Sequence, residues 1–465
     1  MKLTPSHNLS LKKAIESALP PGKHPRLLSG IVVGSLTRNE VLYERNADKL
    51  LIPASVNKIF TAFAALRKLK PTGTFKTYLY AKGPVREGQL QGDLYIKGGG
   101  DPSLVSERMW MLVNELIRWD VKKITGDIIG DASYFDEEKT PLTRPKYLKD
   151  QAYNAPVGAL SFNFNTTTVY VRAGEKIGEP PRVHTDPQNS YIDVINHGTT
   201  KGAGTKNSIV VSRTDFVKGD IGDTVLLRGS IPLDAPEMRF YRNIVNPTLY
   251  AGHMFKNFLE QRGIQVQGRV KEGRVPETAK LLVEFDSLPL WQLIWGMNKF
   301  SNNFVADQIL KKLGAHMWGE PGTLIKGITA VEDVLEDVGI KKKSYEIFDG
   351  SGLTRDTLVT ARQVLTVLTN AWQDFSISAE FVASLGIAGE DGTIRRRFPN
   401  ASVPAIRAKT GSLDGVTSLA GFATSADNEP LAFAIILNDP AMKYGKMTAW
   451  VDAIAVALTK FSRKF

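Results

Sequence analysis

The chain has 465 residues, of which 42% are hydrophobic and 23% charged, a composition that excludes a disordered or low-complexity protein and at this length corresponds to roughly three units of about 150 residues. It contains no cysteine, which excludes disulfides, thiolate nucleophiles and cysteine-ligated metal centres. Lys and Arg outnumber Asp and Glu by 59 to 48, for a net charge of +11; this balance favours an acidic partner, but the basic runs are short, so no nucleic acid is expected.

The N-terminal part of the chain is predicted to form a helix, a hairpin and a second helix. Its first residues lack the apolar core of a signal peptide, and no run of about 18 apolar residues occurs, so no transmembrane segment is expected. Residues 9–19 have helical spacing, and the β-rich runs 30–36 and 40–43 flank a turn. A strongly apolar helix then extends to Leu69.

The middle of the chain is predicted to be a β-rich insertion. Residues 76–97 alternate like strands, and one helix at 109–118 stands among many short strands separated by Gly, Pro and Asn. Helical periodicity dominates from about 284 to 338 and returns at 361–374.

The C-terminal part is predicted to be a three-strand meander followed by a helix, with strands at 405–410, 418–424 and 431–438 and the helix at 446–461. If the two ends of the chain come together, the early hairpin and this meander form one antiparallel sheet. We therefore expect one domain from residues 1–72 and 276–465 and an inserted β-rich domain, of one or two lobes, from residues 73–275.

Ser55-Val56-Asn57-Lys58 places a hydroxyl and an amine three residues apart, on one face of a helix start. The run at 59–66 is apolar or small on every side, which predicts a helix buried all round. Burial lowers the pKa of an amine, so that it can act as a base toward a neighbouring nucleophile. The same spacing occurs in residues 10–13 on an amphipathic helix, where a solvated lysine is expected, so the spacing alone does not identify a nucleophile.

Two later motifs each allow two interpretations. Ser301-Asn302-Asn303 opens an amphipathic stretch and suits either a cleft or an ordinary helix N-cap. Lys409-Thr410-Gly411-Ser412 ends a predicted strand. Its amine and hydroxyl suit a substrate carboxylate and its glycine permits close approach of a substrate backbone, but an ordinary turn with an exposed lysine would have the same residues.

The sequence lacks the motifs of several other enzyme and nucleotide-binding classes. The six histidines form no His-Glu-x-x-His motif and no pairing with a nucleophile, so neither a metalloprotease nor a Ser-His-Asp enzyme is expected. A Walker loop is absent, and Gly202-Ala203-Gly204 is a lone Gly-x-Gly. We expect no metal and no cofactor.

The order of the three motifs is more specific than any one of them. Ser-x-x-Lys, Ser-x-Asn and Lys-Thr-Gly in succession resemble the signature of penicillin-binding proteins and serine β-lactamases. The long gap between Ser55 and Ser301 resembles that of the D-alanyl-D-alanine carboxypeptidase/endopeptidase family, peptidase family S13, to which penicillin-binding protein 4 belongs. Further segments similar to this family cover essentially the whole chain; they lie at 98–104, 126–131, 349–355, 389–393 and 408–413.

The resemblance implies an α+β fold. It consists of a transpeptidase-like domain, with an antiparallel five-stranded sheet flanked by helices and a helical subdomain, interrupted by the β-rich insertion. It also implies a periplasmic enzyme whose leader has been removed, with peptidoglycan peptide stems as substrates and β-lactams as covalent inhibitors.

Catalytic roles are carried over by motif. The resemblance implies that Ser55 attacks the carbonyl of the penultimate D-alanine, with Lys58 as its base, to form an acyl-enzyme that water hydrolyses. Ser301 would relay a proton to the leaving amine with electrostatic support from Lys409, and Asn303 would hydrogen-bond an amide of the substrate.

Substrate-binding roles follow in the same way. Thr410 and Ser412 would hold the terminal carboxylate beside Gly411, and the backbone N–H groups of Ser55 and Ser412 would form an oxyanion hole. Arg355 is similar in position to an arginine that receives the far carboxylate of diaminopimelate, which suits a guanidinium. Asn163 falls near where some relatives place an acid that meets the free ammonium of the substrate, so the missing charge puts tight recognition of that group in doubt.

Two alternative functions remain open at this stage. One is a β-lactamase-like or esterase-like hydrolase, for which no convincing Glu-bearing loop is visible. The other is a wall-binding protein or β-lactam sensor that is acylated but scarcely turns over; the presence of the whole reactive set argues against an inactive scaffold.

Overall fold

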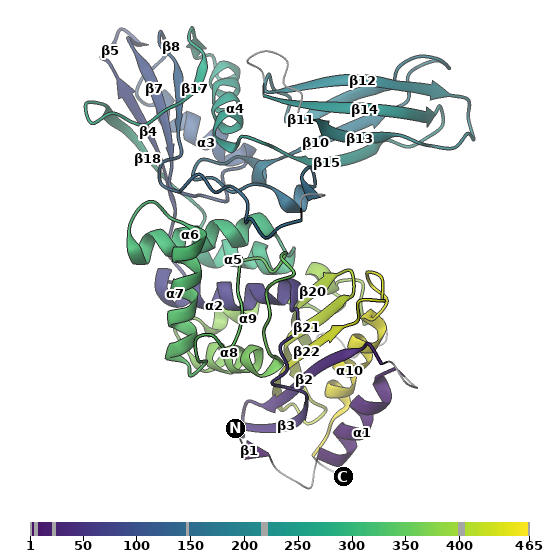
Figure 1. Cartoon of the computed structure of the whole chain (residues 1–465). Helices are drawn as coiled ribbons and strands as arrows, with labels where there is room; N and C mark the ends of the chain where they lie inside the picture. The colour runs from purple at the N-terminus through teal and green to yellow at the C-terminus, as the bar shows by residue number, and fades with distance from the viewer. Residues whose placement is uncertain are drawn as a thin grey trace. The chain divides into compact units, whose positions relative to one another are not determined.

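The chain folds into two compact units, shown in Figure 1. The computed structural model describes residues 2–3, 8–20, 25–145, 148–214, 222–398 and 405–463. Unit 1 is formed by Met1–Gly73, Pro141–Arg144 and Pro289–Phe465, and unit 2 by Thr74–Thr140 and Pro145–Leu288. The two ends of the chain therefore build one unit, and a short segment from within the insertion, 141–144, belongs with them.

The sheet of unit 1 joins strands from both ends of the chain, so that the purple β2 lies beside the yellow β22 in Figure 1. Its strand order is β1-β3-β2-β22-β21-β20-β19. The predicted hairpin and meander form its five long strands, which pair antiparallel throughout: β2 (Leu28–Ser35), β3 (Glu40–Arg45), β20 (Ile406–Leu413), β21 (Val416–Thr424) and β22 (Pro430–Asn438).

Two edge strands depart from the expected five-stranded sheet. β1 (Lys2–Leu3) runs parallel to β3, and β19 (Gly386–Ile387) pairs antiparallel with β20, so the sheet has seven strands. Each is only two residues long, which is too short for a period-2 alternation to reveal it.

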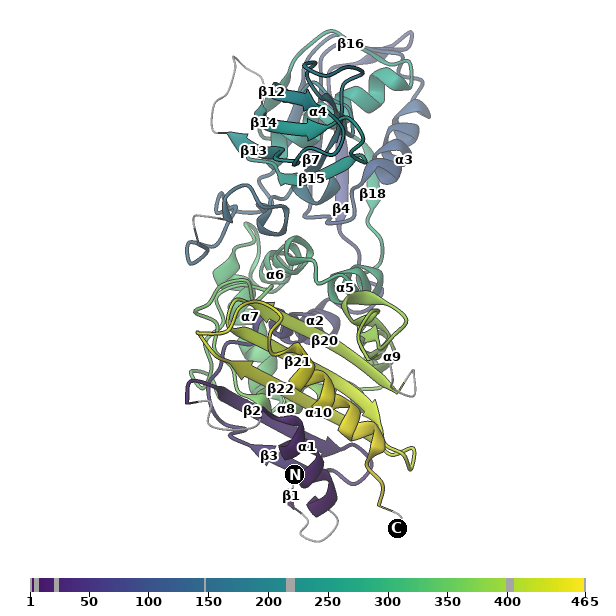
Figure 2. The same cartoon turned by 90° about the vertical axis from the view of Figure 1, so that its right-hand side faces the viewer.

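Helices cover both faces of this sheet. Figure 2 shows α1 and α10 on one face and α8 on the other; Ile15 of α1 and Ile454 of α10 share a core cluster with Phe433 and Ile435 of β22. The described helices of unit 1 are α1 (Asn8–Ala18), α2 (Lys58–Leu69), α5 (Leu290–Lys299), α6 (Asn303–Trp318), α7 (Leu324–Asp337), α8 (Ala361–Gln373), α9 (Ser378–Ser384) and α10 (Thr448–Lys460), with the 3₁₀ turns η1 (Ala54–Asn57) and η5 (Gly392–Ile394). As predicted, α2 is buried on every side over residues 58–66.

The described residues of unit 2 form four sheets and two helices, in agreement with a β-rich insertion. The sheets have the orders β17-β9-β7-β4-β18, β16-β8-β6-β5, β11-β10-β15 and β12-β14-β13. Their strands are β4 (Lys76–Lys82), β5 (Val85–Arg86), β6 (Gln89–Leu90), β7 (Asp93–Gly98), β8 (Lys123–Ile124), β9 (Ile128–Asp131), β10 (Thr166–Arg172), β11 (Arg182–Asp186), β12 (Ile192–Lys201), β13 (Val210–Thr214), β14 (Asp223–Pro232), β15 (Met238–Asn243), β16 (Gln265–Val266), β17 (Val270–Glu272) and β18 (Lys280–Asp286). The helices are α3 (Ser106–Ile117) and α4 (Pro247–Gln261), and short 3₁₀ turns lie at η3 (Ala152–Asn154) and η4 (Asn163–Asn165).

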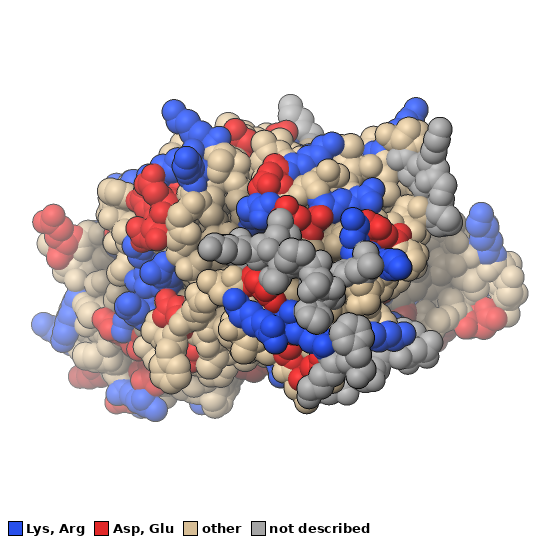
Figure 3. Space-filling model, turned by 90° about the horizontal axis from the view of Figure 1, so that it is seen from below, with Lys and Arg blue, Asp and Glu red and all other residues tan. Residues whose placement is uncertain are grey.

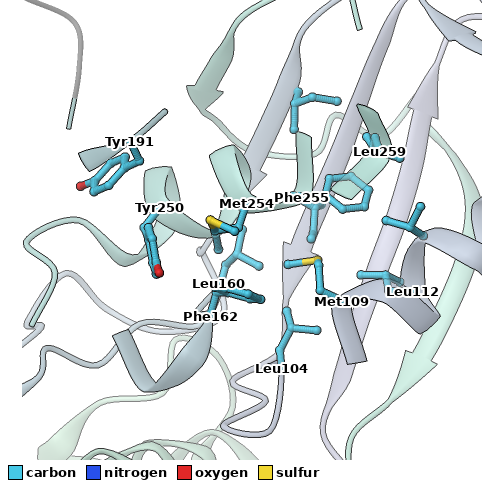
Figure 4. Packing of buried hydrophobic residues seen from close by; sticks show 14 of the residues in the cluster. Leu104, Met109, Leu112, Leu160, Phe162, Tyr191, Tyr250, Met254, Phe255 and Leu259 are labelled. Carbon is cyan, nitrogen blue, oxygen red and sulfur yellow. The ribbon is translucent and has the colours of Figure 1, made fainter. Parts of the chain in front are cut away.

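One hydrophobic cluster runs through unit 2. In Figure 4, Met109 and Leu112 of α3 face Phe255 and Leu259 of α4. The same cluster continues to residues of β12, β13 and β14, so the sheets of this unit share one apolar core instead of forming independent ones.

The predicted boundary at residue 275/276 and the predicted helical start at 284 differ from the structure. β18 pairs antiparallel with β4, which places residues up to Leu288 in unit 2. The register shifts between Leu281 and Val283. At this irregularity the sequence has three apolar residues in succession, Leu281, Leu282 and Val283. They interrupt the alternation by which a strand is recognised.

The surface charge of the chain is mixed where Figure 3 shows it. On that face Lys and Arg side chains are interspersed with Asp and Glu side chains. Within the described ranges, no helix combines the length and apolar character that crossing a bilayer requires.

We expect Leu112→Ala to lower the free energy of unfolding by about 2–5 kcal/mol, because the side chain is fully buried and its removal leaves a cavity. Leu233→Ala makes the same change at a side chain that is 40% exposed, and we expect a change within about 0.5 kcal/mol. Chemical denaturation of both variants measures the difference. Equal losses would contradict the position of Leu112 in the core of unit 2.

Candidate active site

Ser55 lies in the 3₁₀ turn η1, which runs directly into α2. The preceding Ala54 has φ 48°, a left-handed conformation that residues other than glycine rarely adopt. The chain therefore turns sharply before Ser55 and carries it at the entrance of a buried helix, as the sequence predicts. By contrast, Ser10, which has the same spacing to a lysine, is exposed on α1, and so is Lys13.

Lys58 is fully buried and its amine lies beside Ser55. Its Nζ is 3.0 Å from Ser55 Oγ, 2.6 Å from Asn303 Oδ1 and 2.7 Å from the carbonyl oxygen of Ser351. The amide oxygen and the carbonyl can only accept hydrogen bonds. A neutral amine therefore directs its two N–H groups to them and its lone pair to Ser55 Oγ.

The electrostatic surroundings keep this amine near the boundary between its charged and neutral forms. Burial lowers the pKa of Lys58 to about 7, while the nearby carboxylates of Asp307 and Asp349 act in the opposite direction and Arg144 adds to the lowering. At neutral pH a large share of Lys58 is thus in the form that can accept a proton.

A second buried lysine faces the same region from β20. Lys409 Nζ donates to Ser301 Oγ at 2.8 Å and to the carbonyl of Thr410 at 2.8 Å. Burial first, and then the charge of Lys58, hold the pKa of Lys409 well below its usual value. Ser301 itself has φ 57°, whereas Asn302 is the N-cap of α6 and accepts from the N–H of Val305. The Ser-Asn-Asn motif therefore serves both a helix cap and a polar cluster.

The segment before Ser55 is fastened to the central sheet. Ile52 exchanges two hydrogen bonds with the side chain of Asn438 on β22, at 2.8 and 3.1 Å. Ser418 Oγ on β21 donates to the carbonyl of Pro53 at 2.5 Å. A Cβ on Gly411 would lie 2.3 Å from that same carbonyl and 3.2 Å from the nitrogen of Ser55. Gly411 thus lets β20 pack directly on the turn that carries Ser55.

The Lys-Thr-Gly residues lie inside β20, which continues to Leu413, so the interpretation as an exposed turn is wrong. Thr410 Oγ1 is 2.8 Å from Thr393 Oγ1 on η5, and Ser412 pairs with Thr417 of β21 in the sheet register. Hydroxyl groups therefore follow one another along the strand that borders Ser55.

Comparison with known proteins agrees with this geometry. A family model described as the D-Ala-D-Ala carboxypeptidase 3 (S13) family matches residues 11–460. The chain belongs to this family. Membership makes it a hydrolase of the penicillin-binding, serine carboxypeptidase class.

Individual S13 relatives cover almost the whole chain. A D-alanyl-D-alanine carboxypeptidase from Actinomadura sp. (strain R39) is 33% identical over 97% of this chain and 85% of its own length. The crystal structure of penicillin binding protein 4 from Haemophilus influenzae has a TM-score of 0.81 and 26% identity, covering 96% of this chain and 97% of that one. A second structure of that protein, complexed with a β-lactam, has a TM-score of 0.75. These matches confirm the predicted α+β penicillin-binding fold.

Two of the predicted site residues of this S13 protein have other hydrogen-bond partners than the buried cluster among the described residues. Arg355 is exposed in unit 1, and its Nη2 donates to the carbonyl of Asp414 at 2.6 Å. Asn163 lies in unit 2, where its Oδ1 accepts from the N–H of Ser106 at 3.2 Å. The structure thus links Ser55, Lys58 and Asn303 on one side and Lys409 and Ser301 on the other, but gives neither Arg355 nor Asn163 a bond to them.

A group of buried charges near Lys58 was not predicted from the sequence. Arg144 and Asp307 form an ion pair with side chains that are 3% and 0% exposed, and Asp349 lies 3.6 Å from the same guanidinium. Asp307 could have been found, because it follows Asn303 by one helical turn and so lies on the same face of α6 as a predicted site residue. Arg144 stands in a polar loop and gives no such signal. Asp349 forms a turn by accepting from the N–H of Ser351 at 3.0 Å.

Gly352→Ala is expected to displace the turn that carries Ser55. A Cβ at this position would lie 2.0 Å from the carbonyl oxygen of Ala54, and a misplacement of about 1 Å in a catalytic group costs roughly 10²-fold in rate. The rate of acylation by a fluorescent penicillin measures this effect.

Gly204→Ala is the matched control. Gly204 and Gly352 share φ 72°, so alanine meets the same backbone strain at both, but no atom lies within 4 Å of a Cβ at 204. Its acylation rate should equal that of the wild type. Equal rates for the two variants would show that the contact with Ala54 is unimportant.

Proposed function

We propose that this protein is a serine DD-peptidase that hydrolyses D-Ala-D-Ala termini and D-Ala–diaminopimelate cross-links of peptidoglycan through a Ser55 acyl-enzyme. The observation that carries the proposal is the environment of Lys58 Nζ, which lies 3.0 Å from Ser55 Oγ while two pure acceptors take its other hydrogen bonds. Family membership supports the substrate class.

In the acylation step, Ser55 Oγ attacks the carbonyl carbon of the penultimate D-alanine and its proton passes to Lys58 Nζ. The C–N bond of the scissile peptide then breaks, and the leaving amine takes a proton from Ser301 Oγ. The ammonium form of Lys409 replaces that proton across the 2.8 Å hydrogen bond between its Nζ and Ser301 Oγ, so that acylation leaves Lys58 as an ammonium and Lys409 as an amine. The step leaves an ester at Ser55.

In the deacylation step, a water molecule attacks the ester carbonyl. Its proton passes to the amine of Lys409, the bond between the acyl carbon and Ser55 Oγ breaks, and the Lys58 ammonium returns a proton to Ser55 Oγ across their 3.0 Å contact. Backbone N–H groups of Ser55 and Ser412 stabilise the oxyanion in both steps; removal of one such donor typically costs about 2.7–4 kcal/mol in the barrier. The packing of β20 on the η1 turn supports this assignment.

We assign recognition of the substrate to residues along β20, to the side-chain amide of Asn303 and to the guanidinium of Arg355. Thr410 and Ser412 hold the terminal carboxylate, and Asn303 hydrogen-bonds an amide of the peptide stem. Arg355 receives the far carboxylate of diaminopimelate, since a guanidinium fits a carboxylate in two-pronged geometry. The exposure of Arg355 supports this role, because the group is accessible to a ligand.

We further propose that the protein works in the periplasm and is inhibited covalently by β-lactams. Peptidoglycan lies outside the cytoplasmic membrane, so a DD-peptidase must be exported to meet it. The β-lactam complex of the Haemophilus influenzae relative supports the second point.

Ser55→Ala should abolish both acylation and turnover while the fold stays intact, because it removes one oxygen atom from a partly buried position. Fluorescent-penicillin labelling, D-alanine release from a diacyl tripeptide and cleavage of cross-links in intact sacculi are the three measurements. Labelling that persists in the variant would move the nucleophile elsewhere. Wild-type labelling without product would instead indicate a sensor with little turnover.

Arg355→Ala should weaken hydrolysis of substrates that carry a diaminopimelate carboxylate by about tenfold or more, since a hydrogen bond to a charged group contributes about 1.5–3 kcal/mol. Hydrolysis of a diacyl tripeptide without that carboxylate should be unchanged. The ratio of kcat/KM for the two substrates is the measurement, and an equal loss on both would remove Arg355 from the recognition of diaminopimelate.

A further inference from the structure

We propose that Arg144 and Asp307 are positioning residues that set the charge state of Lys58 and thereby the pH at which Ser55 is acylated. The proposal rests on the role of Lys58 as base under the proposed function. Neither residue belongs to the three signature motifs, and Arg144 comes from the short segment of the insertion that packs in unit 1.

The loop at 349–354 connects these residues to the helix that bears Lys58. Three successive carbonyls of the loop accept hydrogen bonds from side chains of η1 and α2. The carbonyl of Asp349 accepts from Asn57 Nδ2 at 2.8 Å, that of Gly350 from Thr61 Oγ1 at 2.8 Å, and that of Ser351 from Lys58 Nζ at 2.7 Å. The position of this loop therefore decides where the lysine amine points.

The carboxylates of Asp307 and Asp349 hold the same loop through its N–H groups. Asp307 Oδ1 accepts from the N–H of Gly350 at 2.9 Å, and Asp349 accepts from the N–H groups of Ser351 and Thr354 at 3.0 and 3.2 Å. A Cβ on Gly350 would lie 2.6 Å from the carbonyl of Ala306, so the loop packs closely against α6.

Arg144 is the cation that faces these two carboxylates. Its Nη2 bonds to Asp307 Oδ2 and donates to Ser351 Oγ at 3.1 Å, and it lies 3.6 Å from Asp349 Oδ2. Because the two side chains are only 3% and 0% exposed, removal of one partner leaves the other charge buried and uncompensated, which is far more costly than at the surface.

Charged groups face Lys58 from four directions: Asp307 on α6, Asp349 in the loop, Arg144 in the segment 141–144 and Lys409 on β20; Lys311, also fully buried, lies one turn beyond Asp307 on α6. The two carboxylates favour the ammonium form of Lys58, and the cations favour the amine. Loss of Arg144 should therefore keep Lys58 protonated to higher pH, and loss of the Asp307 charge should release its proton at lower pH.

The test is the pH dependence of acylation by a fluorescent penicillin in Arg144→Met and Asp307→Asn. The wild-type rate should rise with pH through about 7, where the pKa of Lys58 lies. We expect the midpoint of this rise to move up by about one pH unit in Arg144→Met and down by about one in Asp307→Asn, the size of shift that one nearby charge produces. Arg144→Lys should restore a midpoint close to that of the wild type.

Arg362→Met is the control for loss of a positive charge, because Arg362 forms an exposed ion pair with Asp48 on another part of unit 1. Its midpoint should equal that of the wild type. Thermal unfolding shows which variants fold. If Arg144→Met does not fold, the downward shift of the pH midpoint in Asp307→Asn tests the proposal by itself.

Each outcome separates this inference from the proposed function. If the wild type is not acylated at any pH, both fail. If the wild type is acylated but the folded variants lose rate equally at every pH, only the inference fails and the ion pair is merely structural. Shifts of opposite sign are a result that a general loosening of the site cannot produce.

Discussion

The burial of the Lys58 amine is the constraint on which the rest of this site depends. An amine in water holds its proton at neutral pH and cannot act as a base. Here the apolar surroundings of α2 reduce the stability of the charged form, and an amide oxygen and a carbonyl fix the direction of the lone pair. The sheet of unit 1, α2 and the loop at 349–354 all contribute to the burial and the orientation of Lys58 Nζ.

The two buried lysines lie close enough for the charge of one to affect the pKa of the other. Lys58 and Lys409 approach the Ser55 region from a helix and from a strand, each with a hydroxyl partner of its own. Both amines are desolvated, and the charge of Lys58 further lowers the pKa of Lys409. The site therefore contains two buried hydroxyl–amine pairs, Ser55 with Lys58 and Ser301 with Lys409.

Much of the fold could be predicted from local patterns, and what was missed has identifiable physical reasons. The hairpin and the meander are marked by β-rich runs between turn residues, α2 is marked by a run that is apolar or small on every side, and the order of the motifs marks the site. The bulge in β18 hides a strand, and two-residue edge strands carry no period at all. Arg144 could not be foreseen, because its partners on α6 and in the loop are distant in sequence and only the tertiary structure brings them together.

The inserted stretch of the chain supplies a residue to the interior of unit 1. Residues 141–144 belong to unit 1 although the stretches on both sides of them belong to unit 2. Excising the whole insertion between residues 73 and 289 would thus also delete a guanidinium from the interior of the remaining unit, leaving two enclosed carboxylates beside the amine. Loss of the insertion is therefore expected to destabilise unit 1 unless another cation takes the place of Arg144.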